Sequence, residues 1–288
     1  MDFGRAVALG RALSPLGGAA LSAIVSRDPQ YVAVERIVRV CGARGVSIVV
    51  GNALVSYRLT ARGEDYWLEL AGYVEGRGGS AASVSPVVLL EGFLDRSAGN
   101  RLLRVQKKRR LERARSLLED IAVRYDAYRD LGFLYSRLLS VLGGRGGEKT
   151  IVFAVKMAYY AYRALGLSVE GVEDIPLPVD RRIGLLSVSS GIVRARCLEE
   201  VVGRYRSSAI RAWSVVSRVS RIPLVDLDAV LWLPLRGADR EILAGRLEEA
   251  RRMYSRSLYR YAEPYLELRR AEEIARLLIA VKPEKCGV

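Results

Sequence analysis

Lysine is the residue type best suited to covalent chemistry in this sequence, because the chain has no histidine and only three cysteines. The lack of histidine excludes Ser-His-Asp and Cys-His catalysis and any histidine-ligated zinc. Cys41, Cys197 and Cys286 are too few for a four-thiolate iron–sulfur or zinc site. Their wide spacing favours inert thiols in a reducing cytoplasm over a disulfide. Catalytic proton transfer must then use Asp, Glu, Lys, Tyr or Cys.

Lysine is also rare, since 40 of the 46 basic residues are arginine and only six are lysine. Arginine stays protonated, whereas lysine can lose its proton and attack carbon. Ordinary exchange between the two types is enough to explain four of the lysines, namely Lys107, Lys108, Lys282 and Lys285. Lys149 and Lys156 therefore become the candidates for a specific role.

A glycine-rich turn, LGGRGGEK, precedes Lys149 and separates two apolar segments with helical periodicity. Glycines permit the positive φ angles of a tight turn and expose backbone N–H groups. Together with the start of the next helix and Arg145 at the tip, these groups would form a phosphate site. The alternative is a hairpin that only turns the chain. It is not a P-loop, because Glu148 precedes Lys149 and the preceding segment is helical.

Lys149 is placed where an amine can act as a nucleophile. The positive end of a helix and a neighbouring arginine disfavour the ammonium form, and a neutral amine can form a Schiff base. The alternative is an ordinary surface lysine at a helix start. Asp180 follows Pro178 and Val179 in a later loop. It can cap the next helix, act as a carboxylate partner in a cleft, or do both.

These motifs resemble the helix-hairpin-helix DNA glycosylases, in which a hairpin ending in lysine is followed by a helix and a Gly/Pro-rich loop with Asp. More narrowly, GGEKTIVFAVKMAYYAYRALG and IPLPVDRRIG are similar to the archaeal 8-oxoguanine DNA glycosylase family, called AGOG. NALVSYRLTARGEDYW and DLDAVLW extend the likeness, which covers about Gln30 to Trp232. The longer hairpin and the longer Lys-to-Asp spacing agree with this archaeal branch. The iron–sulfur cysteines of the endonuclease III branch are missing.

The resemblance implies a bifunctional DNA glycosylase and AP lyase that excises 8-oxoguanine and nicks the strand by β-elimination. Lys149 would be the Schiff-base nucleophile and Asp180 the essential carboxylate. The base pocket would draw on Gln30, Ser56, Trp67, Phe153, Lys156, Asp228 and Trp232. The DNA backbone would be held by Gly143, Gly144, Arg145, Gly146 and Gly147. The expected partner is duplex DNA with an oxidised guanine, and no metal or organic cofactor is expected.

The helical spacing supports part of this assignment. Phe153 lies one turn after Lys149 and Lys156 lies near the same face. Trp232 would be a second stacking wall for an extruded base. As alternatives, Phe153, Trp67 and Trp232 are core aromatics, and Ser56 bonds back within its own helix. Lys156 on an apolar face is harder to explain structurally, since an unpaired buried ammonium is costly, and Asp228 could pair with it.

The elements that must position these residues are helices, and we predict an all-α fold of two helical subdomains flanking a cleft. Periodicity indicates helices at 30–41, 64–74 and 241–281, and 46–59 is assigned to a helix despite its β-branched start. Residues 76–85 are expected to form a loop. We expect 1–100 with 185–288 as one subdomain and 101–184, with the hairpin, as the other.

The net charge of +14 favours a polyanionic partner such as nucleic acid. Residues 101–115 hold eight basic residues and one acid, either as a phosphate-facing stripe or as a solvated helix face.

The N-terminal segment is apolar, but Arg11 and Pro15 interrupt it, so we expect no membrane span. We expect a cytoplasmic, nucleoid-associated protein that is a monomer. The arginine-rich composition hints at a thermophile. Two alternative functions remain open: a non-enzymatic helix-hairpin-helix duplex DNA-binding protein, and a glycosylase for another base.

Overall fold

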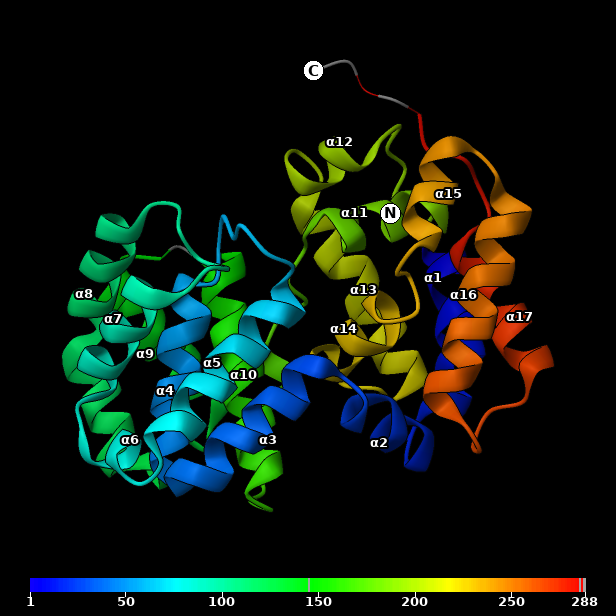
Figure 1. The fold of residues 1–288 in the computed structure, drawn as a ribbon. Helices are drawn as coiled ribbons and strands as arrows, with labels where there is room; N and C mark the ends of the chain where they lie inside the picture. Colours follow the sequence, from blue (N-terminus) through cyan, green and yellow to red (C-terminus); the bar gives the residue numbers. More distant parts are fainter. Residues whose placement is uncertain (145, 285, 287–288) are drawn as a thin grey trace. The chain divides into compact units, whose positions relative to one another are not determined.

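The computed structural model describes residues 1–144, 146–284 and 286, with only the backbone of Asp174. Its described residues form helices and turns without strands, apart from an isolated bridge between Asp130 and Glu170, which confirms the all-α prediction. The chain divides into two compact units (Figure 1). We call Asp28–Ile175 the central unit, and Met1–Arg27 with Pro176–Val288 the terminal unit.

The central unit is one continuous segment of helices. Its α-helices are α3 (Pro29–Cys41), α4 (Gly45–Val55), α5 (Gly63–Arg77), α6 (Ser80–Ser83), α7 (Pro86–Arg96), α8 (Arg104–Val123), α9 (Leu131–Leu142) and α10 (Lys149–Ala164). Short 3-10 turns are η2 (Gly42–Arg44), η3 (Tyr125–Tyr128) and η4 (Val172–Asp174). The boundaries differ from the expected 100/101 and 184/185, because α3, α4 and α7 pack against α8 and α10 rather than with the chain ends.

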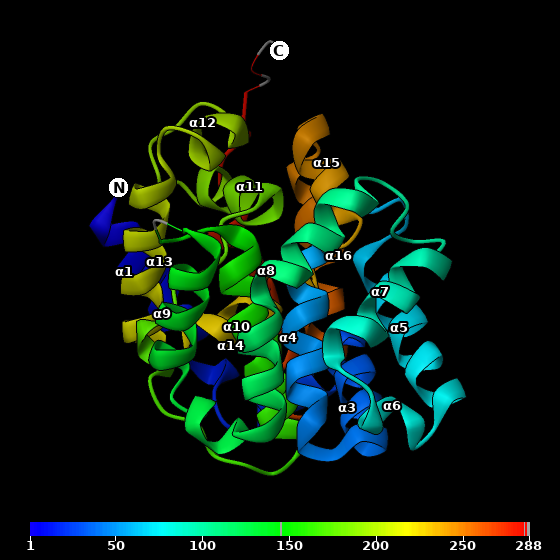
Figure 2. The same cartoon turned by 90° about the vertical axis from the view of Figure 1, so that its left-hand side faces the viewer.

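Helix α4 is the core of the central unit. All of its residues are buried, and α3, α7, α8 and α10 pack around it (Figure 2). A helix that is apolar on every side is stable only when it is surrounded in this way. Gly51 allows the closest approach, since a Cβ there would lie 2.5 Å from Leu90 Cδ1. The β-branched start of this segment is therefore compatible with a helix, as predicted.

One local expectation was wrong. Residues 76–85 are not simply a loop, because α5 continues to Arg77 and α6 follows at Ser80–Ser83. The basic segment 101–115 is not helical from its first residue. Helix α8 begins at Arg104, after Leu103 in the left-handed conformation with φ 60°. The sequence pattern alone did not indicate this turn, because left-handed leucine is unusual.

The terminal unit is assembled from both ends of the chain. Its elements are α1 (Phe3–Leu13), η1 (Ser14–Leu16), α2 (Ala19–Ser26), α11 (Arg181–Ser189), α12 (Leu198–Val202), α13 (Arg206–Ser220), α14 (Leu224–Trp232), α15 (Ala238–Ala244), α16 (Leu247–Ala262) and α17 (Leu268–Leu278). Helix α1 packs against α13 and α17, and α16 lies beside α17. Helix α14 is buried along its whole length and contacts α2, α11 and α13.

The prediction of inert thiols is wrong for two of the three cysteines. Cys197 and Cys286 form a disulfide within the terminal unit, with their Cα atoms 5.9 Å apart. The C-terminal segment runs back along the α11–α12 connection, where the Glu284 N–H donates to the Arg196 carbonyl at 2.8 Å. This return brings the distant cysteines together. Cys41 is a buried free thiol, and burial raises its pKa to about 11.

The α3–α4 run, residues 29–55, is long and apolar enough to cross a membrane by length and composition. Of its most apolar window, 72% is buried inside the fold. It is also interrupted by the η2 turn. A core helix passes the same test, and we interpret this run as the core of the central unit.

Candidate active site

The hairpin between α9 and α10 has the glycine-dependent geometry that the sequence predicts. Gly143 ends α9 in the left-handed conformation, with φ 68°. Gly146 and Gly147 also have positive φ angles, of 102° and 73°. Glycine adopts these angles without the steric cost that a side chain would bring. Arg145, predicted at the tip, lies outside the described residues.

The backbone N–H groups of the hairpin glycines already have acceptors inside the hairpin. Those of Gly143 and Gly144 donate to the Leu139 carbonyl, that of Gly146 to the Glu148 carboxylate and that of Gly147 to the Tyr135 hydroxyl. The last two bonds are 2.9 and 2.7 Å long. A phosphate that used these two amides would have to replace side-chain acceptors rather than fill a vacant cradle.

Lys149 is the first residue of α10, and its side chain is exposed. Glu148 is the N-cap residue, but its carboxylate bonds back to Gly146 rather than to the helix start. The next residue, Thr150, accepts a hydrogen bond from Arg110 Nη2 at 2.9 Å. The exposed Lys149 side chain thus lies at the positive end of the helix dipole, one residue before the Thr150 that Arg110 contacts.

An aromatic pair lies on the same side of α10. The rings of Phe153 and Trp67 meet edge to face, with centroids 5.9 Å apart. Trp67 is only 1% exposed, whereas Phe153 is half-buried. Trp67 is therefore a core residue, as the alternative interpretation held, and it also supports the more accessible Phe153 ring.

Lys156 is buried at 1% exposure, and its Nζ lies 5.1 Å from the centre of the Tyr160 ring. The Tyr160 hydroxyl donates to Asp28 at 2.9 Å. The other oxygen of Asp28 accepts from the Gln30 N–H at 2.8 Å. Gln30 Oε1 is buried without a hydrogen-bond partner among the described residues. A buried acceptor of this kind is costly unless a ligand supplies the donor.

Sequence reasoning missed Asp28 and Tyr160. Asp28 directly precedes a helix that starts with proline, which is an N-cap signal and hides any second role. Tyr160 lies one helical turn after Lys156, so the spacing could have identified it. The cluster in the central unit thus combines a cation, a carboxylate, an amide and aromatic rings.

Ser56 follows the last residue of α4, and its hydroxyl donates to the Asn52 carbonyl at 2.8 Å. This is the back-bonding that the sequence analysis offered as the alternative. The bond uses the hydroxyl proton but leaves the oxygen able to accept.

The remaining predicted residues belong to the terminal unit. Asp180 is the N-cap of α11 and accepts from the N–H groups of Arg182 and Ile183, at 2.8 and 3.0 Å. The Arg182 guanidinium lies over the Trp232 ring, 5.0 Å from its centre. Asp228, one turn before Trp232 on α14, is 8% exposed. Asp180 therefore caps its helix. Its carboxylate accepts both of these hydrogen bonds through one oxygen and can still act as an acidic group in a site.

Comparison with known proteins identifies the family. A family model described as AGOG, N-glycosylase/DNA lyase, matches residues 10–269. The chain belongs to this family. Its relatives include the N-glycosylase/DNA lyase of Aeropyrum pernix, 38% identical over 231 residues that cover 77% of this chain and 79% of the relative. The enzyme of the same name from Methanopyrus kandleri is 37% identical over 212 residues, covering 72% and 79%.

A solved structure of the AGOG family has the same fold. It is the 8-oxoguanine DNA glycosylase Pa-AGOG from Pyrobaculum aerophilum, complexed with 8-oxoguanosine. The TM-score is 0.68 at 26% identity, over 93% of this chain and 96% of the other. The resemblance inferred from the sequence is thereby confirmed.

An arginine-lined groove lies beside the AGOG hairpin, and we call it the arginine groove. It has a volume of about 260 Å³ and is lined by Tyr57, Gln106, Arg109, Arg110, Arg113 and Leu142. Arg110 reaches from the groove to Thr150, next to Lys149, and its Nε is buried without a partner. Burial lowers the pKa of Arg110, and Arg113 adds to this effect. Crowded cations of this kind favour an anion between them.

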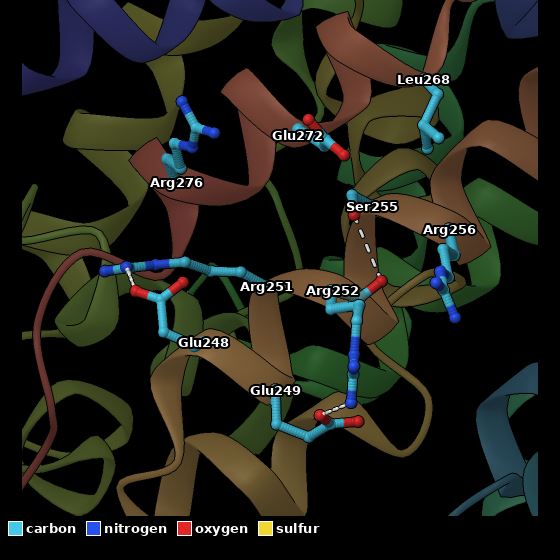
Figure 3. A pocket seen from close by; sticks show the side chains of 9 residues that line it. All are labelled: Glu248, Glu249, Arg251, Arg252, Ser255, Arg256, Leu268, Glu272 and Arg276. Carbon is cyan, nitrogen blue, oxygen red and sulfur yellow. Dashed lines mark hydrogen bonds and ion pairs between the residues drawn. The ribbon is translucent and has the colours of Figure 1, made fainter.

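A second, larger groove of about 440 Å³ lies in the terminal unit of this AGOG chain, along α16 and α17 (Figure 3). Two of the arginines that line it are paired with acids on the same helix, Arg251 with Glu248 and Arg252 with Glu249. None of the predicted site residues lines it. We interpret it as a solvated groove between two charged helices, since such surface pairs are common and weak.

Proposed function

We propose that this chain excises 8-oxoguanine from DNA and then cleaves the strand as an AP lyase. The observation that carries the proposal is the family match over residues 10–269 together with an exposed lysine at the start of α10, directly after the glycine hairpin. The non-enzymatic alternative explains the basic charge, but phosphate binding needs neither this amine nor the carboxylate of Asp180.

The proposed chemistry proceeds through a Schiff base. The neutral amine of Lys149 attacks C1′ of the sugar, the N-glycosidic bond breaks, and the base departs with the electron pair and takes up a proton. Asp180 stabilises the positive charge that develops on the sugar. The amine loses a proton, the sugar ring opens, and an imine forms. Loss of a C2′ proton then expels the 3′-phosphate, which nicks the strand.

Polar and aromatic side chains of the candidate site are proposed to bind the extruded base. In the central unit, the Gln30 oxygen without a partner and the Lys156 ammonium offer an acceptor and donors for an edge of the base. Phe153 and Trp232 are each proposed as an aromatic ring on which the extruded base stacks. Because Arg182 covers one face of Trp232, the base must use the opposite face or displace the guanidinium.

The arginine groove is proposed to hold a phosphate of the damaged strand. The hydrogen bond from Arg110, which lines the groove, to Thr150, the residue after Lys149, supports a phosphate close to the proposed nucleophile. The hairpin glycines can add backbone contacts if a phosphate replaces the Glu148 and Tyr135 oxygens. Phosphate contacts of this kind position the duplex without reading its sequence.

Borohydride trapping tests the proposal directly. Borohydride reduces the imine between protein and DNA to a stable amine, so the wild-type chain should give a covalent complex with DNA containing 8-oxoguanine. Lys149→Gln should give none, because the amide cannot form the imine. Lys108→Gln is the matched control, since Lys108 is a lysine of the same unit that pairs with Asp95. Undiminished trapping by Lys149→Gln would exclude Lys149 as the nucleophile.

A further inference from the structure

Three apolar side chains are exposed together at the start of α8. Leu102 is 50% exposed, Leu103 43% and Val105 64%. We call these three residues the apolar tip. Arg101 and Arg104 interrupt the apolar residues, so the tip is surrounded by positive charge. Neighbouring apolar side chains kept in water on a basic surface indicate a binding role more than a packing role.

The backbone of the tip is held in an unfavourable conformation. Leu103 has φ 60° and ψ 31°, the left-handed region that glycine and asparagine adopt far more readily than leucine. No side-chain hydrogen bond caps the helix at this residue. A turn that served only to start α8 would be better made with glycine. Strain of this kind is retained where the side chain itself is needed.

The segment before the tip is rigidly anchored. The Glu69 carboxylate accepts from the Ser97 hydroxyl at 2.8 Å and from the Ala98 N–H at 2.7 Å. The Gly99 carbonyl accepts from the Thr60 N–H at 2.9 Å. These bonds fix the loop against α5 and the α4–α5 connection, so the tip is a firm projection rather than a loose end.

A buried polar network anchors the other side of the tip. Asn100 is fully buried and donates to the Val55 carbonyl at 3.2 Å and to the Tyr66 hydroxyl at 3.0 Å. Lys107, also fully buried, donates to the Asn100 side-chain oxygen. Its Nζ lies 4.8 Å from the centre of the Tyr57 ring. Ordinary exchange between Lys and Arg therefore does not explain Lys107, and that expectation was wrong.

The network also places the tip beside the proposed DNA contacts. Val55 directly precedes Ser56 of the predicted base pocket, and Tyr57 lines the arginine groove. Gln106, the residue after Val105, lines the same groove. A strand whose phosphate occupies that groove would bring its stacked bases toward the tip.

We propose that Leu103, supported by Leu102, is the wedge that enters the base stack of duplex DNA and fills the space left by the extruded nucleotide. Extrusion breaks stacking and pairing, and an apolar side chain inserted between base steps compensates for part of that loss. The inference rests on the proposed function, because it needs a base to be extruded. It deepens that function by naming the residue that makes duplex DNA a substrate.

The experiment compares Leu103→Gly with the wild-type chain on two substrates. One is a fully paired duplex with 8-oxoguanine, and the other carries the same lesion inside a bubble of unpaired bases. Glycine relieves the left-handed backbone, so the variant should melt no lower than the wild type. Excision from the paired duplex should fall about tenfold or more, as expected for the loss of one buried leucine side chain. Excision from the bubble should stay unchanged, because its bases are already unstacked.

Val123→Ala is the control, since Val123 is an exposed apolar residue (72%) at the other end of α8. It should leave both rates unchanged. An equal loss by Leu103→Gly on the two substrates, or no loss on the paired duplex, would overturn the wedge assignment. A wild-type chain that excises 8-oxoguanine from neither substrate would instead overturn the proposed function.

Discussion

Two residues of the candidate site have a structural contact in addition to their proposed chemical role. Asp180 caps α11 through one oxygen, and Lys156 is a buried cation beside an aromatic ring. Neither observation alone separates a structural role from a catalytic one. The two roles can be separated by substitutions that keep the structural contact and remove the chemical group.

For Asp180 the separating substitution is Asn. Asparagine caps a helix as well as aspartate does, so Asp180→Asn should keep the melting temperature and the affinity for DNA. Without the charge that stabilises the cationic sugar, excision should fall about 100-fold or more. Single-turnover rates and equilibrium binding to the same duplex measure the two effects.

Asp130→Asn is the matched control for this prediction, because Asp130 caps α9 by accepting from the Phe133 N–H at 3.0 Å. It should change neither rate nor affinity. If Asp180→Asn lost affinity in proportion to rate, or lost neither, Asp180 would be a helix cap only.

Lys156→Met tests the proposed base pocket. Methionine has similar length and is apolar, so the buried site keeps its packing but loses the donors for the base. Excision of 8-oxoguanine should fall about tenfold or more, while strand cleavage at a preformed abasic site should persist because no base is present. The ratio of the two activities is the measurement, since it does not depend on the folded fraction.

Lys107→Met provides the comparison, because Lys107 is equally buried in the same unit but bonds to Asn100. On the bubble substrate, the Lys107→Met variant should have the same ratio of 8-oxoguanine excision to abasic-site cleavage as the wild-type chain. A Lys156→Met variant with an unchanged ratio would remove Lys156 from the base pocket.

At the scale of elements, α8 carries two surfaces with different tasks. Its start presents the apolar tip, and the following turns present the arginine groove. The sequence analysis left open whether the basic run faced phosphates or only solvent. The groove beside the hairpin now favours the first interpretation for Arg109 and Arg113.

Replacing Arg109 and Arg113 by Gln should weaken binding to duplex DNA and reduce its salt dependence. Each lost phosphate contact releases one counterion fewer, so the slope of log K against log salt should become shallower by about two. Titrations of one duplex at several salt concentrations give this slope. Arg115→Gln on the same helix is the control, because Arg115 pairs with Glu112 and Glu119. Equal slopes for the double variant and the wild type would contradict the phosphate assignment.

The sequence predicted helices better than it predicted turns. The segments around Val34, Trp67 and Lys149 have clear apolar periodicity and fold as expected. The turn at Leu103 was missed because long-range bonds of Glu69 and Asn100 hold the segment before it, and no local sequence pattern indicates such bonds. Asp28 and Tyr160 were not predicted as site residues for the same reason, because their hydrogen bond joins positions far apart in the sequence.

At the scale of the whole molecule, the two units differ in how they are secured. The terminal unit contains the Cys197–Cys286 disulfide, which spans 89 residues, whereas the only cysteine of the central unit is Cys41. A cross-link over that span stabilises by about 4–5 kcal/mol in the chain-entropy model. Reduction should therefore loosen the terminal unit and leave the central unit unchanged.

Hydrogen exchange followed by mass spectrometry can test this prediction. With a reductant, peptides from α11, α12 and α17 should exchange faster, and peptides from α4 and α10 should not change. Cys286→Ser should exchange like the reduced chain and should not respond to the reductant. Equal acceleration in both units would show that they do not respond independently.

The division of the chain also has a consequence for its synthesis. Helix α1 is synthesised well before its partner α13, which begins only at Arg206. At translation rates of roughly 5–20 residues per second, the interval of roughly 190 residues lasts on the order of 10–40 seconds. During that time the central unit, one continuous segment, is already complete. Helix α1 is therefore covered late although it is made before α13, and its apolar face can be bound by a chaperone in the meantime.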